Sequence, residues 1–235
     1  MNIHEAFLSG TRRALVLELA DEDLFELVLR EGGLSEFAAR PLMSGLLEGI
    51  QHIHKAGIAH RDIKLENLLL KDGVVKISDF DLSVAVEAMP TPTADTLSYV
   101  TALQATPCGT FAYAAPEVAG DRDDGYFPYP VDLWSSGICL FAMFTCEFPF
   151  NEPNDSCPEF RDLLRGEFRW PKALSPHAVS LLSGMLSVHP ERRFTVEDAL
   201  QHPWCMTPSS TLRSGSVGSN VIEDLLAGPG PDWKL

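Results

Sequence analysis

The most informative part of the sequence is His-Arg-Asp-Ile-Lys-Leu-Glu-Asn at residues 60–67, followed by Ser-Asp-Phe-Asp at residues 78–81. The first segment supplies a carboxylate at Asp62 and, five residues later, an amide at Asn67; the second supplies a carboxylate at Asp79. Phosphoryl transfer needs a carboxylate that accepts the proton of the attacking hydroxyl. It also needs oxygen ligands that hold Mg²⁺ against the phosphates. The pattern meets both needs, with Asn67 and Asp79 as sufficient protein ligands for the metal.

Between these two segments the sequence predicts a tight hairpin. Residues 68–70 and 74–77 are apolar and flank Asp72 and Gly73, a pair of residues typical of a two-residue turn. The hairpin therefore carries the chain from one candidate segment to the other.

Two long helices are expected on either side of this region. Residues 35–57 place apolar side chains at helical spacing, with Ser35 as the N-cap and Gly57 at the end. Pro41 lies inside that span and predicts a kink in the first turns, because it removes one backbone hydrogen bond. Residues 133–144 are apolar on nearly all sides, which predicts a helix at the centre of the domain.

The remaining expected elements are short. Residues 3–8 and 13–20 have the composition of strands, and the acidic residues 21–23 favour a helix start. Residues 175–186 and 195–202 predict amphipathic helices, the second capped by Thr195. A long exposed loop is expected over residues 88–107, and a disordered tail over 205–235.

Charge and cysteine usage exclude several classes of protein. The 33 acidic residues outnumber the 18 basic ones and give a net charge of −15, which argues against binding to nucleic acid or to an anionic membrane. The five cysteines show no zinc or disulfide spacing, so we expect free thiols. Without a signal peptide or a membrane-spanning run in these residues, the cytoplasm or nucleus is the expected location.

Several segments, in the same order along the chain, resemble the protein kinase superfamily, and the resemblance extends from residue 2 to about residue 204. The features shared are the catalytic loop, the start of the activation segment, its substrate-facing end, the central helix and the end of the fold. These lie at residues 60–67, 78–81, 109–117, 132–137, and 189–195 with 202–204. Lys64 and the sequence of residues 109–117 are of the Ser/Thr type. Residues 60–67 and the double alanine before Pro116 favour the calcium/calmodulin-dependent and AMP-activated kinase group.

The resemblance implies an α+β kinase-like fold with a mostly helical large lobe and only the last strands of the small lobe. Residues 1–204 would form a partial kinase domain, with residues 1–20 as small-lobe remnant and hinge and residues 21–204 as large lobe. Since only two residues precede Ile3, we expect this chain to lack the glycine-rich loop and the phosphate-binding lysine.

The resemblance also implies the roles of individual residues toward ATP and Mg²⁺. Asp62 would be the catalytic base, Lys64 would contact the transferred phosphate, and Asn67 and Asp79 would bind magnesium. Phe80 would pack to set the active state. Further nucleotide contacts would come from the backbones of Glu18 and Ala20, from Leu69 as the floor of the adenine pocket, from Leu17 as gatekeeper and from Glu66.

Other residues are implied to have structural or regulatory roles. Asp132 would hold the backbone of the catalytic loop, and Arg193 would form a buried bidentate pair with Glu117. Arg61 suggests control by phosphorylation of the activation loop, with Thr106 as the site for an upstream kinase. The acidic residues Asp23 and Glu66 lie where basophilic kinases bind an upstream arginine, so we expect protein substrates that are basic around the acceptor.

Two departures from the family pattern leave alternatives open: the expected lack of the glycine-rich loop and phosphate-binding lysine, and the residue at position 81. Asp81 stands where the family has glycine, and aspartate reaches some backbone conformations open to glycine only at some cost. We therefore expect backbone strain and altered switching of the activation segment, not loss of activity. The chain is expected to be part of a protein Ser/Thr kinase that uses ATP. The alternatives are a catalytically inactive, kinase-derived binding or scaffold protein, and a weakly active chain that borrows a small lobe from elsewhere.

Overall fold

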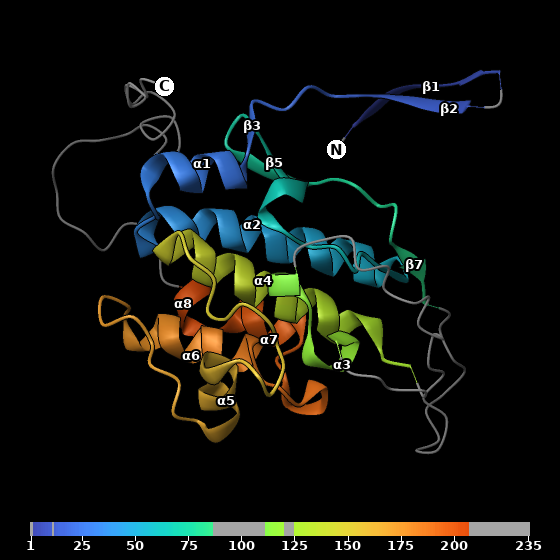
Figure 1. Cartoon of the computed structure of the whole chain (residues 1–235). Helices are drawn as coiled ribbons and strands as arrows, with labels where there is room; N and C mark the ends of the chain where they lie inside the picture. Colours follow the sequence, from blue (N-terminus) through green and yellow to red (C-terminus); the bar gives the residue numbers. More distant parts are fainter. Residues whose placement is uncertain (1, 11, 87–110, 120–124, 207–235) are drawn as a thin grey trace, which may run out of the picture.

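The computed structural model describes residues 2–10, 12–86, 111–119 and 125–206, and shows an α+β fold in which helices predominate (Figure 1). Two long helices, α2 (Glu36–Lys55) and α4 (Pro128–Thr145), lie side by side at its centre. Side chains such as Leu46 and Ile50 of α2 and Trp134 of α4 have no exposed surface. Burial of this apolar surface is the main stabilising contribution to the domain.

Helix α2 follows the sequence pattern closely. The Ser35 hydroxyl accepts a hydrogen bond from the Ala38 amide at 3.3 Å, and Gly57 follows the helix with a φ of 74°. Pro41 lies inside the helix, which nevertheless continues as one element to Lys55. The missing amide of Pro41 therefore does not divide the helix, since later turns are held by packing against α4 and β6.

Helix α4 is longer than the apolar run from which it was predicted. It begins at Pro128 instead of residue 133, because proline at the first helical position loses no hydrogen bond and already has the helical φ. It ends at Thr145, with Cys146 in the left-handed conformation at a φ of 55°. Nearly every residue from Val131 to Met143 is buried, which confirms a central helix that is covered on all sides.

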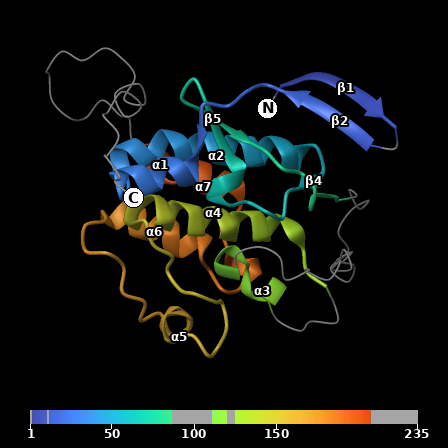
Figure 2. The ribbon, with the colours of Figure 1, turned by 45° about the horizontal axis from the view of Figure 1, so that its top comes forward.

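The strands form three small sheets. Strands β1 (Ile3–Ser9) and β2 (Arg12–Leu17) pair antiparallel in a hairpin that projects from the helices (Figure 2), and β2 ends three residues before the predicted residue 20. A second sheet has the order β3–β5–β6 and a third pairs β4 with β7. Their bounds are β3 (Glu22–Asp23), β4 (Ile58–Ala59), β5 (Leu68–Lys71), β6 (Val74–Ile77) and β7 (Val84–Ala85).

The predicted hairpin between the two candidate segments is confirmed. Strands β5 and β6 pair antiparallel, with Lys71 opposite Val74. Asp72 and Gly73 both have positive φ, 50° and 72°, as a type I′ turn requires. The register brings Leu68, which follows Asn67, opposite Ile77, which precedes Ser78. The hairpin thus returns the chain to the point where the first segment ended.

Shorter helices surround the central pair. The predicted helix after residues 21–23 is α1, which starts at Leu24 with the Asp23 carboxylate accepting from the Glu26 amide. Helix α5 has no counterpart in the sequence predictions, and α8 includes Cys205 and Met206, which the sequence had assigned to the tail. The bounds are α1 (Leu24–Glu31), α3 (Pro116–Ala119), α5 (Pro158–Arg165), α6 (Pro176–Met185), α7 (Val196–Gln201) and α8 (Pro203–Met206).

A single carboxylate joins the beginning of α2 to two later helices. Glu36 accepts hydrogen bonds from the Ser175 amide at 2.6 Å, the Ser175 hydroxyl at 2.8 Å and the Trp204 indole at 2.8 Å. Burial acts to raise the pKa of Glu36, but these three donors outweigh it and hold the pKa below its usual value. The contact places α8 beside the N-terminal end of α6.

A buried ion pair joins α3 to the segment that precedes α7. The Arg193 guanidinium donates to both Glu117 carboxylate oxygens, at 2.7 and 3.0 Å, and both side chains are almost fully buried. Arg193 also donates to the carbonyl oxygens of Pro130 and Ser187 and lies 5.0 Å from the centre of the Trp134 ring. The bidentate pair expected from the sequence is therefore confirmed.

Some predictions fall outside the described residues. The loop at 88–107, with Thr106, belongs to the part of the chain that is not described, as do residues 207–235. The cysteines 139, 146, 157 and 205 are free thiols, as expected, and burial raises the pKa of Cys205 to about 11. Within the described ranges, every helix is too short or too polar to cross a membrane.

The close contact between Gly184 in α6 and the ring of Phe194 predicts the effect of adding a methyl group at residue 184. A Cβ atom on Gly184 would lie 2.2 Å from the Phe194 ring, and the Phe194 amide donates to the Gly184 carbonyl at 3.1 Å, so the ring cannot easily withdraw. We expect Gly184→Ala to lower the free energy of unfolding by about 1–3 kcal/mol in urea denaturation.

Gly45→Ala is the matched control, because it makes the same change inside a helix. A Cβ there would lie at an ordinary 3.7 Å from Val75. Alanine forms helix more readily than glycine, so this variant should gain up to about 1 kcal/mol. Equal effects of the two variants would contradict the packing described.

Candidate active site

Asp132 on α4 anchors the beginning of the predicted catalytic loop, residues 60–67, through hydrogen bonds to its backbone. This carboxylate has no exposed surface and accepts from the backbone amides of His60 at 2.9 Å and Arg61 at 2.7 Å. It also lies 2.8 Å from Nε2 of His54, which donates because a carboxylate can only accept. A buried charge is tolerated when it is fully hydrogen-bonded, and three donors from two segments of chain satisfy this one.

His54 is oriented in turn by α4. Its ring stacks on Tyr129 at 4.2 Å, and the Tyr129 hydroxyl donates to the His54 carbonyl at 3.2 Å. The sequence analysis did not identify His54 as a partner of Asp132. No local signal identifies it, because His54 and Asp132 are 78 residues apart and meet only through the crossing of α2 and α4.

Two residues of the site have a strained backbone. Arg61 and Asp79 have φ values of 65° and 60°, in the left-handed region that non-glycine residues seldom occupy. Such conformations cost roughly 1–3 kcal/mol and persist where surrounding contacts determine them. At Arg61 the determining contact is the hydrogen bond from its amide to Asp132.

His60 connects the two candidate segments. Its Nδ1 accepts from the Asp62 amide at 3.3 Å, so its Nε2 carries the proton that is donated to the Ser78 carbonyl at 2.9 Å. Its ring also meets that of Phe80 edge-on, at 4.8 Å between centroids. The buried imidazole thereby fixes the peptide that precedes Asp79.

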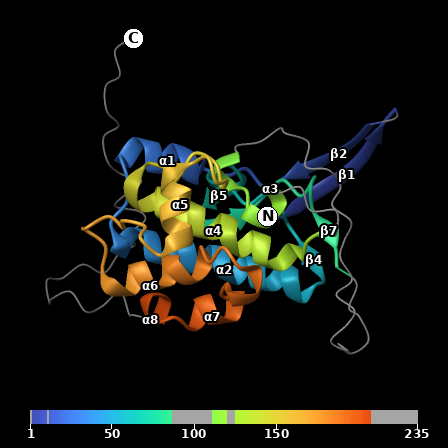
Figure 3. The same cartoon turned by 60° about the horizontal axis from the view of Figure 1, so that its bottom comes forward.

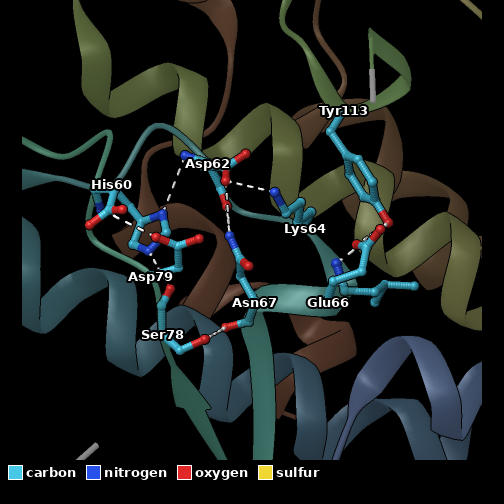
Figure 4. Close-up of polar contacts among 10 residues, drawn as sticks. His60, Asp62, Lys64, Glu66, Asn67, Ser78, Asp79 and Tyr113 are labelled. Atoms are coloured by element: carbon cyan, nitrogen blue, oxygen red, sulfur yellow. Dashed lines mark hydrogen bonds and ion pairs between the residues drawn. The ribbon is translucent and has the colours of Figure 1, made fainter. Parts of the chain in front are cut away.

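Asp62, Lys64 and Asn67 form a compact polar cluster (Figure 4). The Oδ2 atom of Asp62 accepts from Nζ of Lys64 at 2.8 Å and from Nδ2 of Asn67 at 3.0 Å. The Asn67 amide group also donates to the Asp62 carbonyl at 2.9 Å. Since both of these bonds use Nδ2 of Asn67, its Oδ1 atom is left to act as an acceptor or metal ligand.

Asp79 lies near enough to this cluster for its charge to act on Lys64. Burial acts to lower the pKa of Lys64, but the hydrogen bond and charge of Asp62 outweigh it, with further contributions from Glu66 and Asp79. The resulting pKa lies above the usual lysine value, so the ammonium form is favoured. Figure 4 shows Asp79 beside His60, near the Asp62–Asn67 pair.

The position of Asp79 is set by a second link to the loop. The Asn67 carbonyl accepts from both the amide and the hydroxyl of Ser78, each at 2.9 Å. Ser78 was not selected from the sequence as a positioning residue. Asp79 then accepts from the Asp81 amide through Oδ1 at 3.4 Å.

The strain expected at Asp81 is found at Asp79 instead. Among the described residues, the positive-φ positions other than glycine include Asp79 but not Asp81. Aspartate at position 81 therefore occupies ordinary backbone space in this conformation, and the turn is accommodated two residues earlier.

Glu66 faces the segment that closes the site. Its carboxylate accepts from the Tyr113 hydroxyl at 3.5 Å, and the same hydroxyl accepts from the Leu65 amide at 3.4 Å. Burial raises the pKa of Tyr113 far above its usual value, so the hydroxyl remains a donor. Tyr113 was also missed as a positioning residue, although it lies within the matched segment 109–117.

The residues expected to contact adenine lie along β5 and the connection from β2. Leu69 pairs with Lys76, whose ammonium lies 3.7 Å from the Glu18 carboxylate. Ala20 precedes Asp21, whose amide donates to the Leu70 carbonyl at 2.8 Å. The structure thus brings the segment with Glu18 and Ala20 alongside β5, the central strand of the β3–β5–β6 sheet, which carries Leu69.

A cavity of about 560 Å³ lies between the β1–β2 hairpin, β6 and α2. Leu17 lines it from the hairpin, and Asp79, Phe80 and Asp81 line it from the other side. Glu18, Ala20 and Leu69 do not line it. The predicted gatekeeper therefore faces the same space as the start of the activation segment, whereas the predicted adenine contacts lie outside that space.

The Arg61 side chain is already engaged in this conformation. Its Nε atom donates to the Leu82 carbonyl at 2.8 Å, and the guanidinium lies 3.5 Å from the Tyr126 hydroxyl. Arg61 thereby ties the loop to the activation segment beyond Asp81. The described residues contain no group of three or more His, Cys, Asp or Glu side chains arranged to hold a metal ion.

Comparisons with known proteins agree with this geometry. A family model of the protein kinase domain matches residues 1–205. A Ser/Thr protein kinase, cds1 of Schizosaccharomyces pombe, is 34% identical over 221 residues, covering 88% of this chain and 44% of that protein. CBL-interacting serine/threonine-protein kinase 7 of Arabidopsis thaliana is 36% identical over 225 residues, covering 95% and 49%. The chain thus spans about half the length, or less, of these relatives.

The buried carboxylate of Asp132 predicts a large effect of a nearly isosteric change. Asp132→Asn replaces one acceptor oxygen with a side-chain NH₂ group, which cannot accept a hydrogen bond. A buried backbone N–H group of the catalytic loop then loses its acceptor. We expect the free energy of unfolding to fall by about 1–3 kcal/mol for each such amide. Denaturation in urea measures this effect.

Asp155→Asn is the control, because Asp155 is exposed and the chemical change is the same. It should change stability by less than about 0.5 kcal/mol. If Asp132→Asn were equally mild, the carboxylate would not be what holds the catalytic loop.

Proposed function

The chain belongs to the protein kinase family, and from this premise we propose that its protein transfers the γ-phosphate of ATP to Ser or Thr hydroxyls of other proteins. The observation that carries the proposal is the hydrogen-bonded cluster of Asp62, Lys64 and Asn67 with Asp79 beside it. The names of the relatives, all protein kinases and several of them serine/threonine kinases, support this substrate class.

In this proposal Asp62 accepts the proton of the attacking hydroxyl. Its carboxylate is oriented by Lys64 and Asn67, which satisfies the need for a base of fixed position. Lys64 stays protonated because of the surrounding carboxylates, and would donate to the transferred phosphate in place of Asp62 when substrate is bound. Orientation and charge neutralisation supply most of the catalysis in phosphoryl transfer.

The donor set of the site fits a magnesium ion. Oδ1 of Asn67 and the carboxylate of Asp79 are hard oxygen ligands, and Mg²⁺ takes one or two such ligands together with phosphate oxygens and water. When bound, the ion would neutralise charge on the phosphates. We assign the adenine contacts to the backbones of Glu18 and Ala20 and to Leu69, with Leu17 as gatekeeper, and assign Glu66 to the nucleotide side of the site.

The domain bounds proposed are residues 1–20 for the small-lobe strands and hinge, and residues 21–204 for the large lobe. The α8 helix extends the second unit to Met206. Because this chain covers about half of its relatives or less, the activity of the whole protein rests on this proposal.

A binding or scaffold protein derived from a kinase remains the second candidate. It would need the fold and the surface, but not the cluster of Asp62, Lys64, Asn67 and Asp79. The bonds within the catalytic loop favour the enzyme, since a scaffold has no chemical need for a lysine that is held against the carboxylate of Asp62. A weakly active chain that uses a small lobe from another protein would show the same cluster, and would be active only with that partner present.

Regulation is proposed at two levels. Arg61 would meet a phosphate on Thr106 added by an upstream kinase, through the terminal nitrogens of its guanidinium, since only Nε is bonded to the Leu82 carbonyl. Several relatives are named as CBL-interacting, which supports a regulatory protein partner for this protein as well.

The proposed base predicts a specific loss of activity. Asp62→Asn should lower the rate of γ-phosphate transfer to Ser/Thr peptides by about 10²- to 10⁴-fold while leaving the fold intact, because asparagine cannot accept the proton. Transfer is measured on residues 1–235 and on the full-length product of the same gene.

Asp72→Asn is the control for this test, because Asp72 lies at the exposed hairpin turn and asparagine tolerates its left-handed φ. It should keep the wild-type rate. If the full-length product transfers no phosphate, the binding-protein reading replaces the enzyme.

Acidic residues near the site predict the sequence preference. Glu66 is half-buried beside Tyr113. One carboxylate oxygen of Asp23 accepts a hydrogen bond from the backbone amide of Glu26 in α1. A peptide library scanned with Arg or Lys upstream of the acceptor should show a preference that Glu66→Gln reduces about two- to fivefold. Glu26→Gln, on the exposed face of α1, is the control. A library with no gain from basic residues would refute the preference.

A further inference from the structure

A groove lined by apolar and basic side chains lies on the face of the helical region formed by α5, α6 and the loops that follow them. It has a volume of about 390 Å³. Its wall is apolar and its rim carries three basic residues. The wall comprises Leu163, Leu164, Phe168, Trp170, Leu186 and Val188, and the rim comprises Arg165, His189 and Arg192. We call this surface the basic groove.

The basic groove is unusual because no acidic residue lines it. The cavity beside Asp79 is lined by two aspartates, the one near His54 by two glutamates, and the one near Phe148 by Glu147, Glu159 and Asp162. The whole chain has a net charge of −15. A purely basic rim in such a chain marks a local site for a negatively charged occupant.

The cations of the rim are available for such an occupant. In the described part of the chain, neither Arg165 nor Arg192 forms an ion pair, and His189 lies 3.8 Å from Glu191 on the exposed side. Leu164, on the wall, is 45% exposed. The surface therefore offers apolar area together with two arginines that form no ion pair within the described residues.

The chain itself contains a segment with the complementary chemistry. Residues 221–226 read Val-Ile-Glu-Asp-Leu-Leu, with two acidic residues between two pairs of large apolar residues. In a helix the apolar pairs, four residues apart, would share one face and the two acids would lie beside it. We propose that residues 221–226 bind in the basic groove of the same molecule, with Glu223 and Asp224 facing Arg165 and Arg192.

The connection is long enough for this contact. Helix α8 lies at the N-terminal end of α6, because Glu36 bonds both Ser175 and Trp204. The groove lies at the C-terminal end of α6, and Figures 1 and 3 both show α6 between α8 and α5. The ten residues of α6 span about 15 Å, whereas the 14 residues 207–220 reach up to about 46 Å when extended.

Binding within one molecule also has an entropic advantage. A tethered segment is present at a high effective concentration, of the order of millimolar for short linkers, so a few apolar contacts and two charge pairs are sufficient. The inference does not depend on the proposed function, since it concerns a surface away from Asp62.

The test is hydrogen–deuterium exchange on the whole chain, 1–235, followed in peptides that cover residues 160–192. Reversing the charge of the segment, by Glu223→Arg with Asp224→Arg, should speed hydrogen exchange in residues 160–192 by more than about threefold. Reversal of the rim by Arg165→Glu with Arg192→Glu should do the same. The fourfold variant, which pairs the reversed charges, should recover most of the protection.

Two control variants and one measurement separate the alternatives. Asp232→Arg, outside the segment, and Lys172→Glu, outside the groove, should leave exchange unchanged. Unaltered exchange in both reversed variants, or no recovery in the fourfold variant, would overturn the proposal. Protection that falls on dilution would also overturn it, because the occupant would then be a second copy of the chain.

Discussion

The buried carboxylate of Asp132 is the interaction on which the rest of the site depends. It lies on the central helix α4 and binds the amides of His60 and Arg61, which places the catalytic loop against the core. The third donor, His54, comes from α2. One side chain thereby joins the two longest helices to the loop that carries Asp62. A charge with no exposed surface is stable only when all three donors stay in place, so the loop has little freedom to move.

The same constraint accounts for the strain in the site. Arg61 and Asp79 both have a left-handed backbone conformation. The hydrogen bond from the Arg61 amide to Asp132 fixes the first, and the hydrogen bond from His60 to the carbonyl of Ser78, the residue before Asp79, fixes the second. His60 and Ser78 carry the constraint from the loop to the end of β6. The β5–β6 hairpin matters because its register returns the chain to Asn67. Two carboxylates and an amide from separate segments are thus brought into a small space, as magnesium-dependent phosphoryl transfer requires.

Charge is distributed unevenly over the structure. The acidic residues Asp62, Glu66 and Asp79 lie in the candidate active site, and the whole chain has a net charge of −15. The basic groove at the end of α6 has the opposite sign and lies against apolar side chains. If both proposals hold, the basic substrates and the acidic segment 221–226 would bind at different surfaces of the domain.

Several local features could be predicted from the amino-acid order alone: the caps at Ser35 and Thr195, the hairpin at Asp72 and Gly73, and the central helix. The matched segments also grouped Asp62, Lys64, Asn67 and Asp79. The contacts of His54 with Asp132 and of Tyr113 with Glu66, and the positive φ of Asp79 instead of Asp81, became visible only in the folded chain. These contacts join residues far apart in sequence or depend on the backbone path. Local propensity carries no information on them, because they form only when packed helices bring the partners together.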